Sequence, residues 1–299
     1  MKRDNDLFNE LARNSDFLHE VTESESAKLK ATLVEMLSDI IHFCGEHGIT
    51  YMLSGGSCIG AVRHKGFIPW DDDIDLMMPR EGVMKMIGLY EDGFFPDSYE
   101  LTYPSAHKDS PFLFLKVYKK GTHCVEVFND NSNFPTEISM DIFPLDYAPK
   151  NKIHRKLKGY LLNTIKFIST SLFYVQYPSP SFKVFAKLDR RYRMRYMLRL
   201  MTGYLFYFFK HKNAVWLFDY LCRHSKNEGF LTIASGRGRF YNETLPTSVY
   251  LPVVKVPFEG KMVNIPNGYD VYLTNVYGDY MKMPPVEQRE RHFIIDLKV

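Results

Sequence analysis

Four aspartates in the sequence Asp-Asp-Asp-Ile-Asp, beginning at Asp71, are the residues best suited to do chemistry. If this segment is a strand, Asp71, Asp73 and Asp75 share one face and Ile74 points into the core. Carboxylates this close repel one another, and a cation relieves the repulsion. Mg²⁺ suits such oxygen ligands and often bridges them to substrate phosphates. The run therefore predicts a metal site. The alternative, an acidic loop or helix start, is disfavoured by the apolar residues at 76–78.

A further acid, Asp141, stands between Met140 and Ile142 in a segment that we expect to be a strand. A lone carboxylate in a buried strand is unfavourable without a partner. A neighbouring strand that placed Asp141 beside Asp73 and Asp75 would complete a site of three carboxylates. The alternative is an acid at a sheet edge or strand end. We expect the nearby Asp146 to cap the turn that follows.

The third feature is the Gly55-Gly56-Ser57 sequence between an expected strand and a short helix. Glycines let a backbone approach a phosphate closely, and the N–H groups at a helix start attract anions. Such sequences are also common in ordinary turns, so Gly-Gly-Ser alone indicates little. Its value lies in its position shortly before the acidic run.

Helical periodicity, apolar runs and turn residues predict the elements that position these groups. Residues 1–22 are expected to be a flexible lead-in or a short helix, with Ser24 or Ser26 capping the next helix. We expect helices at 24–46, 58–64, 81–90, 153–173, 181–209, 214–225 and 268–277, and strands at 49–53, 73–77, 99–103, 112–118, 124–128, 138–143, 231–234 and 253–258. This order predicts an α+β fold, a small mixed sheet flanked by helices.

Charge divides the chain into three parts. Between Lys150 and Lys226 there are 17 Lys or Arg residues and two acids, and aromatic residues are interleaved with them. We expect a catalytic core at 1–150, a basic aromatic-rich helical insertion at 151–228, and a return to the core at 229–299. Basic helices with an aromatic apolar side favour an anionic membrane surface. The alternative is a subdomain whose aromatics form its own core.

Composition excludes several classes of protein. With 45% hydrophobic and 24% charged residues, the chain is an ordinary globular protein rather than a disordered or collagen-like one. The four cysteines form no Cys-x-x-Cys pair and the ten histidines show no metal-binding spacing, which argues against disulfide and zinc sites. The charged start and the lack of a long apolar run favour a cytoplasmic location, with the inner face of the cell membrane as a variant of it.

The sequence resembles the LicD family of bacterial enzymes in three blocks. These are residues 50–80, which contain Ser-Gly-Gly-Ser and Trp-Asp-Asp-Asp-Ile-Asp, the Asp-Ile-Phe-Pro-Leu-Asp of 141–146, and Tyr-Gly-Asp-Tyr-Met at 277–281 followed by Pro284-Pro285. The resemblance covers 28–150 and 229–292. One departure is Ser-Cys-Ile at 57–59, where many members carry Thr-Leu-Leu; the hydroxyl is kept. The resemblance to this family implies a nucleotidyltransferase-like core, which fukutin and fukutin-related protein share.

The resemblance also implies roles for individual residues. Asp73, Asp75 and Asp141 would be the catalytic metal ligands, with Mg²⁺ as the cofactor and Mn²⁺ as an alternative. Groups expected to bind the donor are Gly55, Gly56, Ser57, Arg63, Lys65, Trp70, Asp71, Arg237 and Arg239. The last two stand in a glycine-rich loop after an expected strand, where paired arginines suit a diphosphate or a glycan phosphate; the alternative is a surface loop. Arg63 and Lys65 would neutralise a diphosphate unless they form a solvated basic turn. Trp70 would stack on a base or choline, or simply pack beside the strand.

The implied reaction moves a phospho-alcohol from a CDP-alcohol to a cell-surface glycan and releases CMP. Phosphocholine is the first candidate, with ribitol, glycerol and ethanolamine left open, and the acceptor is a lipopolysaccharide, capsule or teichoic acid glycan, with a lipid-linked form included. One alternative is a nucleotidyltransferase that consumes an NTP and releases pyrophosphate. Another is a non-enzymatic module whose basic helices bind nucleic acid. The carboxylates argue against the latter, so we expect no nucleic-acid partner.

Overall fold

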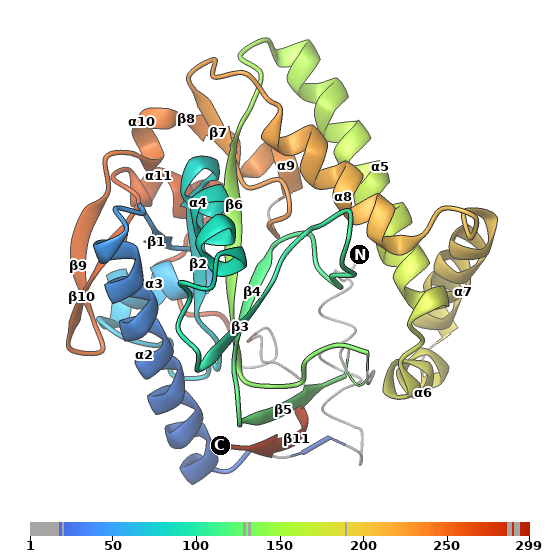
Figure 1. Ribbon diagram of the computed structural model, residues 1–299, viewed down its shortest axis with the longest axis horizontal. Coiled ribbons are helices and arrows are strands. Elements are labelled where there is room, and N and C mark those ends of the chain that lie inside the picture. Colours follow the sequence, from blue (N-terminus) through green and yellow to red (C-terminus); the bar gives the residue numbers. More distant parts are fainter. Residues whose placement is uncertain are drawn as a thin grey trace.

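Strands alternating with amphipathic helices form one mixed sheet that is flanked by helices, which confirms the α+β class (Figure 1). The computed structural model describes residues 18–19, 21–127, 130, 133–188, 190–237, 239–285, 289 and 294–299. The expectation for residues 1–17 lies outside this part. The helices are α2 (Glu23–Glu46), α3 (Gly55–His64), α4 (Arg80–Glu91), α5 (Lys152–Gln176), α6 (Pro180–Leu188), α7 (Arg190–Leu205), α8 (His211–Arg223), α9 (Arg239–Asn242), α10 (Thr247–Tyr250) and α11 (Tyr269–Tyr277).

The main sheet has the order β1-β2-β6-β4-β3, and β7 and β8 extend it from β6. Its strands are β1 (Met52–Leu53), β2 (Asp75–Pro79), β3 (Tyr99–Thr102), β4 (Leu115–Lys119), β6 (Ser139–Tyr147), β7 (Phe230–Thr232) and β8 (Leu245–Pro246). Two smaller pairs join β9 (Val254–Phe258) to β10 (Lys261–Ile265), and β5 (His123–Glu126) to β11 (Ile294–Lys298). Strands β2 and β6 run parallel, and the other pairs in the sheet are antiparallel.

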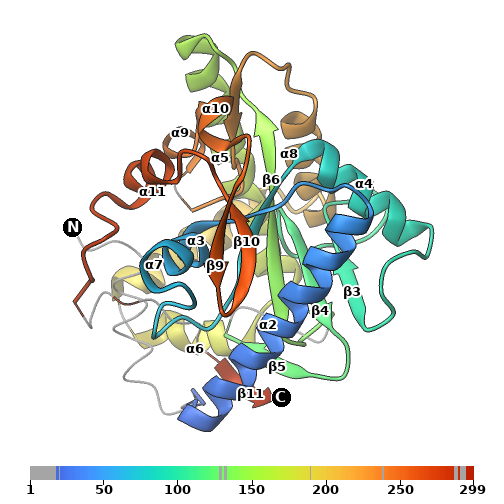
Figure 2. The same ribbon diagram turned by 90° about the vertical axis from the view of Figure 1, so that its left-hand side faces the viewer.

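Helix α2 packs on this sheet through the apolar stripe that the sequence predicts. Leu29, Leu33, Met36, Leu37 and Ile40 are all buried in the main core. The helix begins one residue earlier than expected, because the cap is Thr22 and not Ser24 or Ser26. The Thr22 hydroxyl accepts the Glu25 N–H, and the Glu25 carboxylate accepts the Thr22 N–H, which is a capping box. In Figure 2 this helix crosses in front of the sheet.

Two local expectations near the acidic run are wrong. Gly55-Gly56-Ser57 is not a separate turn, because these residues already form the first turn of α3. The strand β2 begins only at Asp75, so Asp71 and Asp73 lie in the preceding loop and do not share a strand face with it. The alternation argument therefore does not apply to them. The expected helix at 181–209 is divided into α6 and α7.

The four basic helices α5 to α8 lie on the right of Figure 1, and both α5 and α8 pack against other elements of the chain. Buried residues of α5 and α8 share an apolar cluster with Ala148, Ala234 and Phe240. Arg80 at the start of α4 donates two hydrogen bonds to Asp146 and one to Asp219 of α8. Asp146 is thus a buried ion-pair partner, and the expectation that it caps a turn is wrong.

Candidate active site

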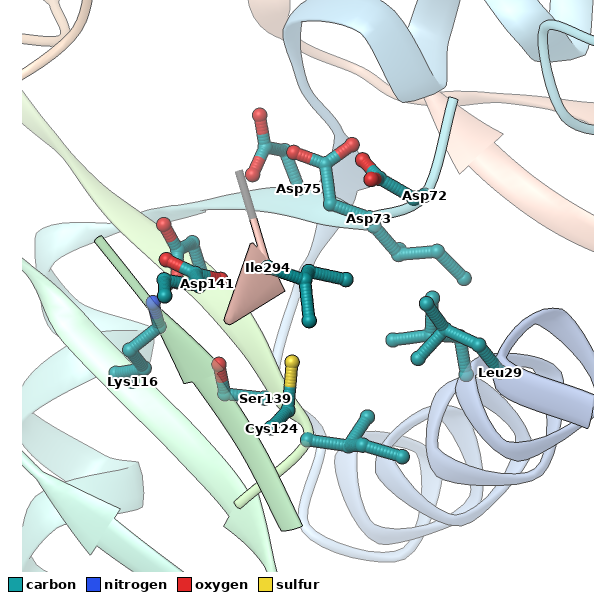
Figure 3. Close-up of a pocket in the computed structure, with 13 residues that line it drawn as sticks. Leu29, Asp72, Asp73, Asp75, Lys116, Cys124, Ser139, Asp141 and Ile294 are labelled. Atoms are coloured by element: carbon teal, nitrogen blue, oxygen red, sulfur yellow. The ribbon is translucent and has the colours of Figure 1, made fainter. Parts of the chain in front are cut away.

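A pocket opens where the carboxylates of the loop before β2 face strand β6. It is lined by Asp72, Asp73, Asp75, Lys116, Glu126, Ser139 and Asp141, together with apolar residues that include Leu29, Leu33 and Ile294. Figure 3 shows the carboxylates of Asp72, Asp73 and Asp75 along one side and that of Asp141 on the neighbouring strand. The three residues expected to hold a metal therefore meet in one pocket, although 66 residues separate Asp75 from Asp141 in the sequence.

Strand pairing explains how distant acids come together. Asp75 at the start of β2 is the register partner of Asp141 on the parallel strand β6. Asp73 stands two residues earlier, in the loop that leads into β2. Oxygen atoms of Asp71, Asp72 and Asp73 also lie within 4.8 Å of one another, so the loop itself gathers carboxylates. Asp72 is an addition to the expected set, and its position in the acidic run could have suggested it.

Lys116 is a site residue that the sequence reasoning missed. It lies on β4 opposite Asp141, and its Nζ is 3.2 Å from the Asp141 carboxylate. Burial opposes its charge, but the carboxylates of Asp141 and Glu126 outweigh that effect and raise the pKa of Lys116 above its usual range. The lysine therefore stays charged and balances part of the pocket's negative charge. The argument applied to Asp141, a lone charge in an apolar strand, would have found Lys116 as well.

The start of α3 lies against the acids and needs both of its glycines. Gly55 has a φ of +50°, and a Cβ there would be 3.1 Å from the Tyr277 hydroxyl and 3.5 Å from a carboxylate oxygen of Asp75. A Cβ on Gly56 would be 3.0 Å from the Asp71 carboxylate. The glycines thus let carboxylates approach the positive end of a helix. The same helix end would also attract a phosphate.

Ser57 is buried, and its hydroxyl accepts the backbone N–H of Asp75 at 2.9 Å. This hydrogen bond fixes the first residue of β2 to the first turn of α3. The hydroxyl expected to contact a phosphate is therefore engaged in positioning Asp75. The contact explains why a hydroxyl residue suits position 57.

Two tyrosines of helix α11, Tyr272 and Tyr277, lie against the start of α3. The Tyr272 hydroxyl accepts the Gly55 N–H at 3.2 Å and lies 3.3 Å from the Ser54 hydroxyl. Burial raises the pKa of Tyr277; the charge of Arg237 opposes this rise, and the carboxylates of Asp75, Glu243 and Asp71 reinforce it. The Tyr277 hydroxyl therefore keeps its proton beside Gly55. Neither tyrosine was expected to be part of the site, although Tyr277 belongs to the third block of the resemblance.

Arg63 and His64 end the helix α3 near this block. Arg63 donates to the Tyr280 carbonyl at 2.7 Å and to the His64 Nε2 at 2.9 Å. Burial lowers the pKa of Arg63, and the nearby carboxylate of Asp71 partly restores it. Burial and the adjacent Arg63 charge lower the pKa of His64. Arg63 therefore anchors α3 and acts electrostatically on Asp71.

The remaining expected donor-binding residues lie further out. Lys65 is exposed at the C-terminal cap of α3, about 15 Å along the helix from Gly55. Trp70 packs partly against the core and carries the Arg289 guanidinium 4.2 Å from its ring centroid. Arg237 is exposed in the loop after β7 and acts on Tyr277. Arg239 begins α9, but its side chain and Gly238 lie outside the described part of the structure.

The carboxylates of the pocket are suitable ligands for a hard divalent cation. Asp73, Asp75 and Asp141 supply only carboxylate oxygens, which are the ligands that Mg²⁺ and Mn²⁺ take in proteins. The glycines of α3 leave room that a side chain would fill beside Asp71 and Asp75. One lysine does not neutralise the negative charge that these acids and Glu126 bring into the pocket. The residues present are therefore compatible with a magnesium site.

Part of the chain that contains this site matches a known family. Residues 48–171 match the model described as LicD/FKTN/FKRP, nucleotidyltransferase domain. That span contains α3, the acidic run, Lys116 and Asp141. This match assigns residues 48–171 to the LicD family. The match also continues into α5.

A LicD relative extends the likeness to most of the chain. The lipopolysaccharide cholinephosphotransferase LicD of Haemophilus influenzae is 28% identical over 265 residues, which cover 86% of this chain and 91% of the relative. An uncharacterized protein of Rickettsia typhi is 28% identical over 47% of this chain and 42% of its own length. An uncharacterized protein of Rickettsia prowazekii is 30% identical over 32% of this chain and 36% of its own length. Within the described residues, every helix is too short or too polar to cross a membrane.

Proposed function

We propose that this LicD family member is a phosphotransferase that moves phosphocholine from CDP-choline to a sugar hydroxyl of lipopolysaccharide and releases CMP. The observation that carries the proposal is the pocket in which Asp73, Asp75 and Asp141 meet beside the glycine start of α3. Its substrates are suggested by the Haemophilus cholinephosphotransferase, to which 86% of the chain is similar.

Transfer of a phosphoryl group depends on alignment and on neutralising charge more than on covalent chemistry. In the proposed reaction, the acceptor hydroxyl oxygen attacks the phosphorus that bears choline. The bond between that phosphorus and the oxygen leading to CMP breaks, and CMP leaves with this oxygen. The proton of the hydroxyl passes to a pocket carboxylate, which acts as the base.

Each described group has a part in this proposal. Asp73, Asp75 and Asp141 would hold Mg²⁺, which when bound offsets the negative charge of the diphosphate. The start of α3 binds the diphosphate through its helix end. Lys116 keeps Asp141 in position through their ion pair. The Tyr277 hydroxyl, which stays protonated, donates a hydrogen bond to the donor beside Gly55.

The first experiment measures CMP release with Mg²⁺ and lipopolysaccharide as acceptor. CDP-choline, CDP-ribitol, CDP-glycerol and CDP-ethanolamine are supplied separately, and CTP is the control donor. We expect CMP from CDP-choline and a loss of at least about a thousandfold in turnover for Asp73→Asn, because that variant removes a carboxylate that would hold Mg²⁺ beside the reacting phosphate. Asp92→Asn, an exposed acid at the end of α4, is the matched control and should behave as the unmodified protein.

Other outcomes assign another function. CMP from a different CDP-alcohol would keep the phosphotransferase and replace choline. Pyrophosphate from CTP, without CMP from any donor, would favour the nucleotidyltransferase. Full turnover by Asp73→Asn would remove the proposed role of the acidic run.

A further inference from the structure

Helix α7 presents two faces of different kinds. Its inner face, formed by Tyr192, Tyr196, Arg199 and Gly203, repeats every three or four residues and packs on α5 and α6. The two tyrosines share an apolar cluster with Phe182 of α6. Arg199 stacks on the Phe167 ring, with 4.2 Å between guanidinium and centroid, and also donates to the Phe167 carbonyl. This face is therefore fully used within the chain.

The outer face of α7 is apolar and exposed. We call it the outer stripe; it comprises Met194, Met197, Leu198, Met201, Leu205 and, just past the helix, Phe208. Their exposed fractions run from 51% to 82%. The spacing of three and four residues places them on the side opposite Tyr196 and Gly203. A continuous apolar stripe of this length on a surface indicates an interaction site rather than scattered exposed side chains.

Charge decides what can cover the stripe. Helix α7 contains five arginines and no acid; Arg190, Arg191 and Arg193 are exposed, as are Lys183 and Lys187 of the adjacent α6. A second copy docked through the same face would bring two sets of arginines together, which is electrostatically unfavourable. Anionic lipid headgroups complement these cations, and an acyl region accepts the methionine and leucine side chains. Tyr204 and Tyr207, both exposed beside the stripe, are of the type that lies at headgroup level.

We propose that the outer stripe of α7 docks the protein on an anionic phospholipid surface, with α7 lying in the plane of the interface. This inference goes beyond the proposed reaction and does not depend on it. It narrows the expectation from the sequence, in which the aromatics of the basic segment face either a membrane or a core. The structure divides these aromatics, because Tyr174 and Phe182 pack inward whereas Tyr204, Tyr207 and Phe208 are exposed.

The test is flotation of the full chain with vesicles of phosphatidylcholine that contain about one-third phosphatidylglycerol. We compare the unmodified protein with a stripe variant that carries Met197→Gln, Met201→Gln and Leu205→Gln. Glutamine keeps a helix propensity close to that of Met and Leu, so α7 should still form. A matched control carries Met84→Gln, Phe94→Gln and Met262→Gln, three exposed apolar residues on other segments. Circular dichroism melting confirms that all three proteins fold.

We expect the unmodified protein and the control to float with the anionic vesicles at low salt, and to bind pure phosphatidylcholine vesicles weakly. The stripe variant should bind at least about tenfold more weakly, because three apolar side chains no longer enter the lipid. Failure of the unmodified protein to float, or equal binding by the stripe variant, overturns the proposal. Light scattering adds one more outcome: a dimer that the stripe substitutions turn into a monomer, without lipid binding, would assign the stripe to a second copy.

Discussion

Strand β6 carries an aspartate near each end, and the two have opposite surroundings. The Asp141 side chain is 22% exposed, faces the pocket, and has Lys116 at 3.2 Å. The Asp146 side chain is 4% exposed and receives two hydrogen bonds from Arg80, which also binds Asp219. Both are charges in an apolar strand with a basic partner, yet only one has an open side.

The difference separates a chemical role from a structural one. At Asp146 the forked guanidinium matches the carboxylate, and the pair links α4, β6 and α8. At Asp141 a single ammonium leaves one side of the carboxylate toward the other acids of the pocket. A buried charge that is completely enclosed by partners supports the fold, whereas one that is partly enclosed remains available for binding.

The largest effect expected from this comparison is on turnover at the open end. Asp141→Asn should lower CMP release at least about a thousandfold, because it removes a carboxylate that would hold Mg²⁺ in the proposed reaction. Its stability should change by less than about 1 kcal/mol, since the loss of the Lys116 ion pair is offset by weaker repulsion among the acids. Kinetics and urea unfolding of the same preparation measure both quantities. A destabilisation of several kcal/mol would show that Asp141 is structural.

At the closed end we expect the reverse. Asp146→Asn should cost about 3 kcal/mol in the free energy of unfolding, because the amide places a donor against a buried guanidinium that keeps only Asp219 as a charged partner. The folded fraction should retain turnover within about threefold of the unmodified protein, since Asp146 is not among the pocket residues. Urea titration with an activity measurement at low denaturant distinguishes the two effects. Loss of activity without loss of stability would contradict the structural assignment.

A smaller effect concerns the pH dependence of stability. His211 begins α8, the helix that carries Asp219, and its ring is buried between Phe173 and Tyr177. Burial lowers the pKa of His211 from 6.5 to about 4, and the charge of Asp109 opposes that shift only in part. Below pH 6.5 this histidine becomes protonated in the unfolded chain, whereas in the folded chain it stays neutral until the pH approaches 4. The stability due to neutral His211 is therefore complete above pH 6.5 and falls as the pH approaches 4.

His211→Phe keeps an aromatic ring in place and removes the titrating group. Between pH 7 and pH 4 the unmodified protein should lose up to about 2 to 3 kcal/mol more stability than this variant. Urea unfolding of both proteins at several pH values gives the difference, in which the other titrating groups cancel. Parallel curves for the two proteins would mean that water or a partner solvates the histidine.

Much of the site could be predicted from the sequence because its signals are local. Asp73, Asp75 and Asp141 are recognisable as acids that continue into, or stand within, apolar segments. Turn residues and apolar runs also located most strands, including β3, β6 and β9, to within a few residues. The sequence predicted that a neighbouring strand would carry Asp141, but not the parallel register that sets it opposite Asp75, because register depends on the whole sheet.

Other features depend on contacts that local patterns do not contain. The Ser57 hydroxyl holds the backbone of Asp75, where β2 begins. The alternation of residue types does not reveal this contact, so the sequence did not show that the acids before Asp75 lie in a loop. Tyr277 reaches Gly55 from the other end of the chain. The sequence also contains both faces of α7 at helical spacing, but which of them meets α5 is decided by Gly203, where a side chain would overlap the Ser171 carbonyl.

The contact of Tyr272 with Ser54 and Gly55 has a consequence for how the protein is made. The two ends of this contact are 218 residues apart, so the glycine start of α3 leaves the ribosome long before the hydroxyl that secures it. Ile294, which lines the pocket formed by Asp73, Asp75 and Asp141, is synthesised later still. During translation the acidic loop is thus present without its final neighbours, and the pocket is complete only after nearly all of these residues have emerged.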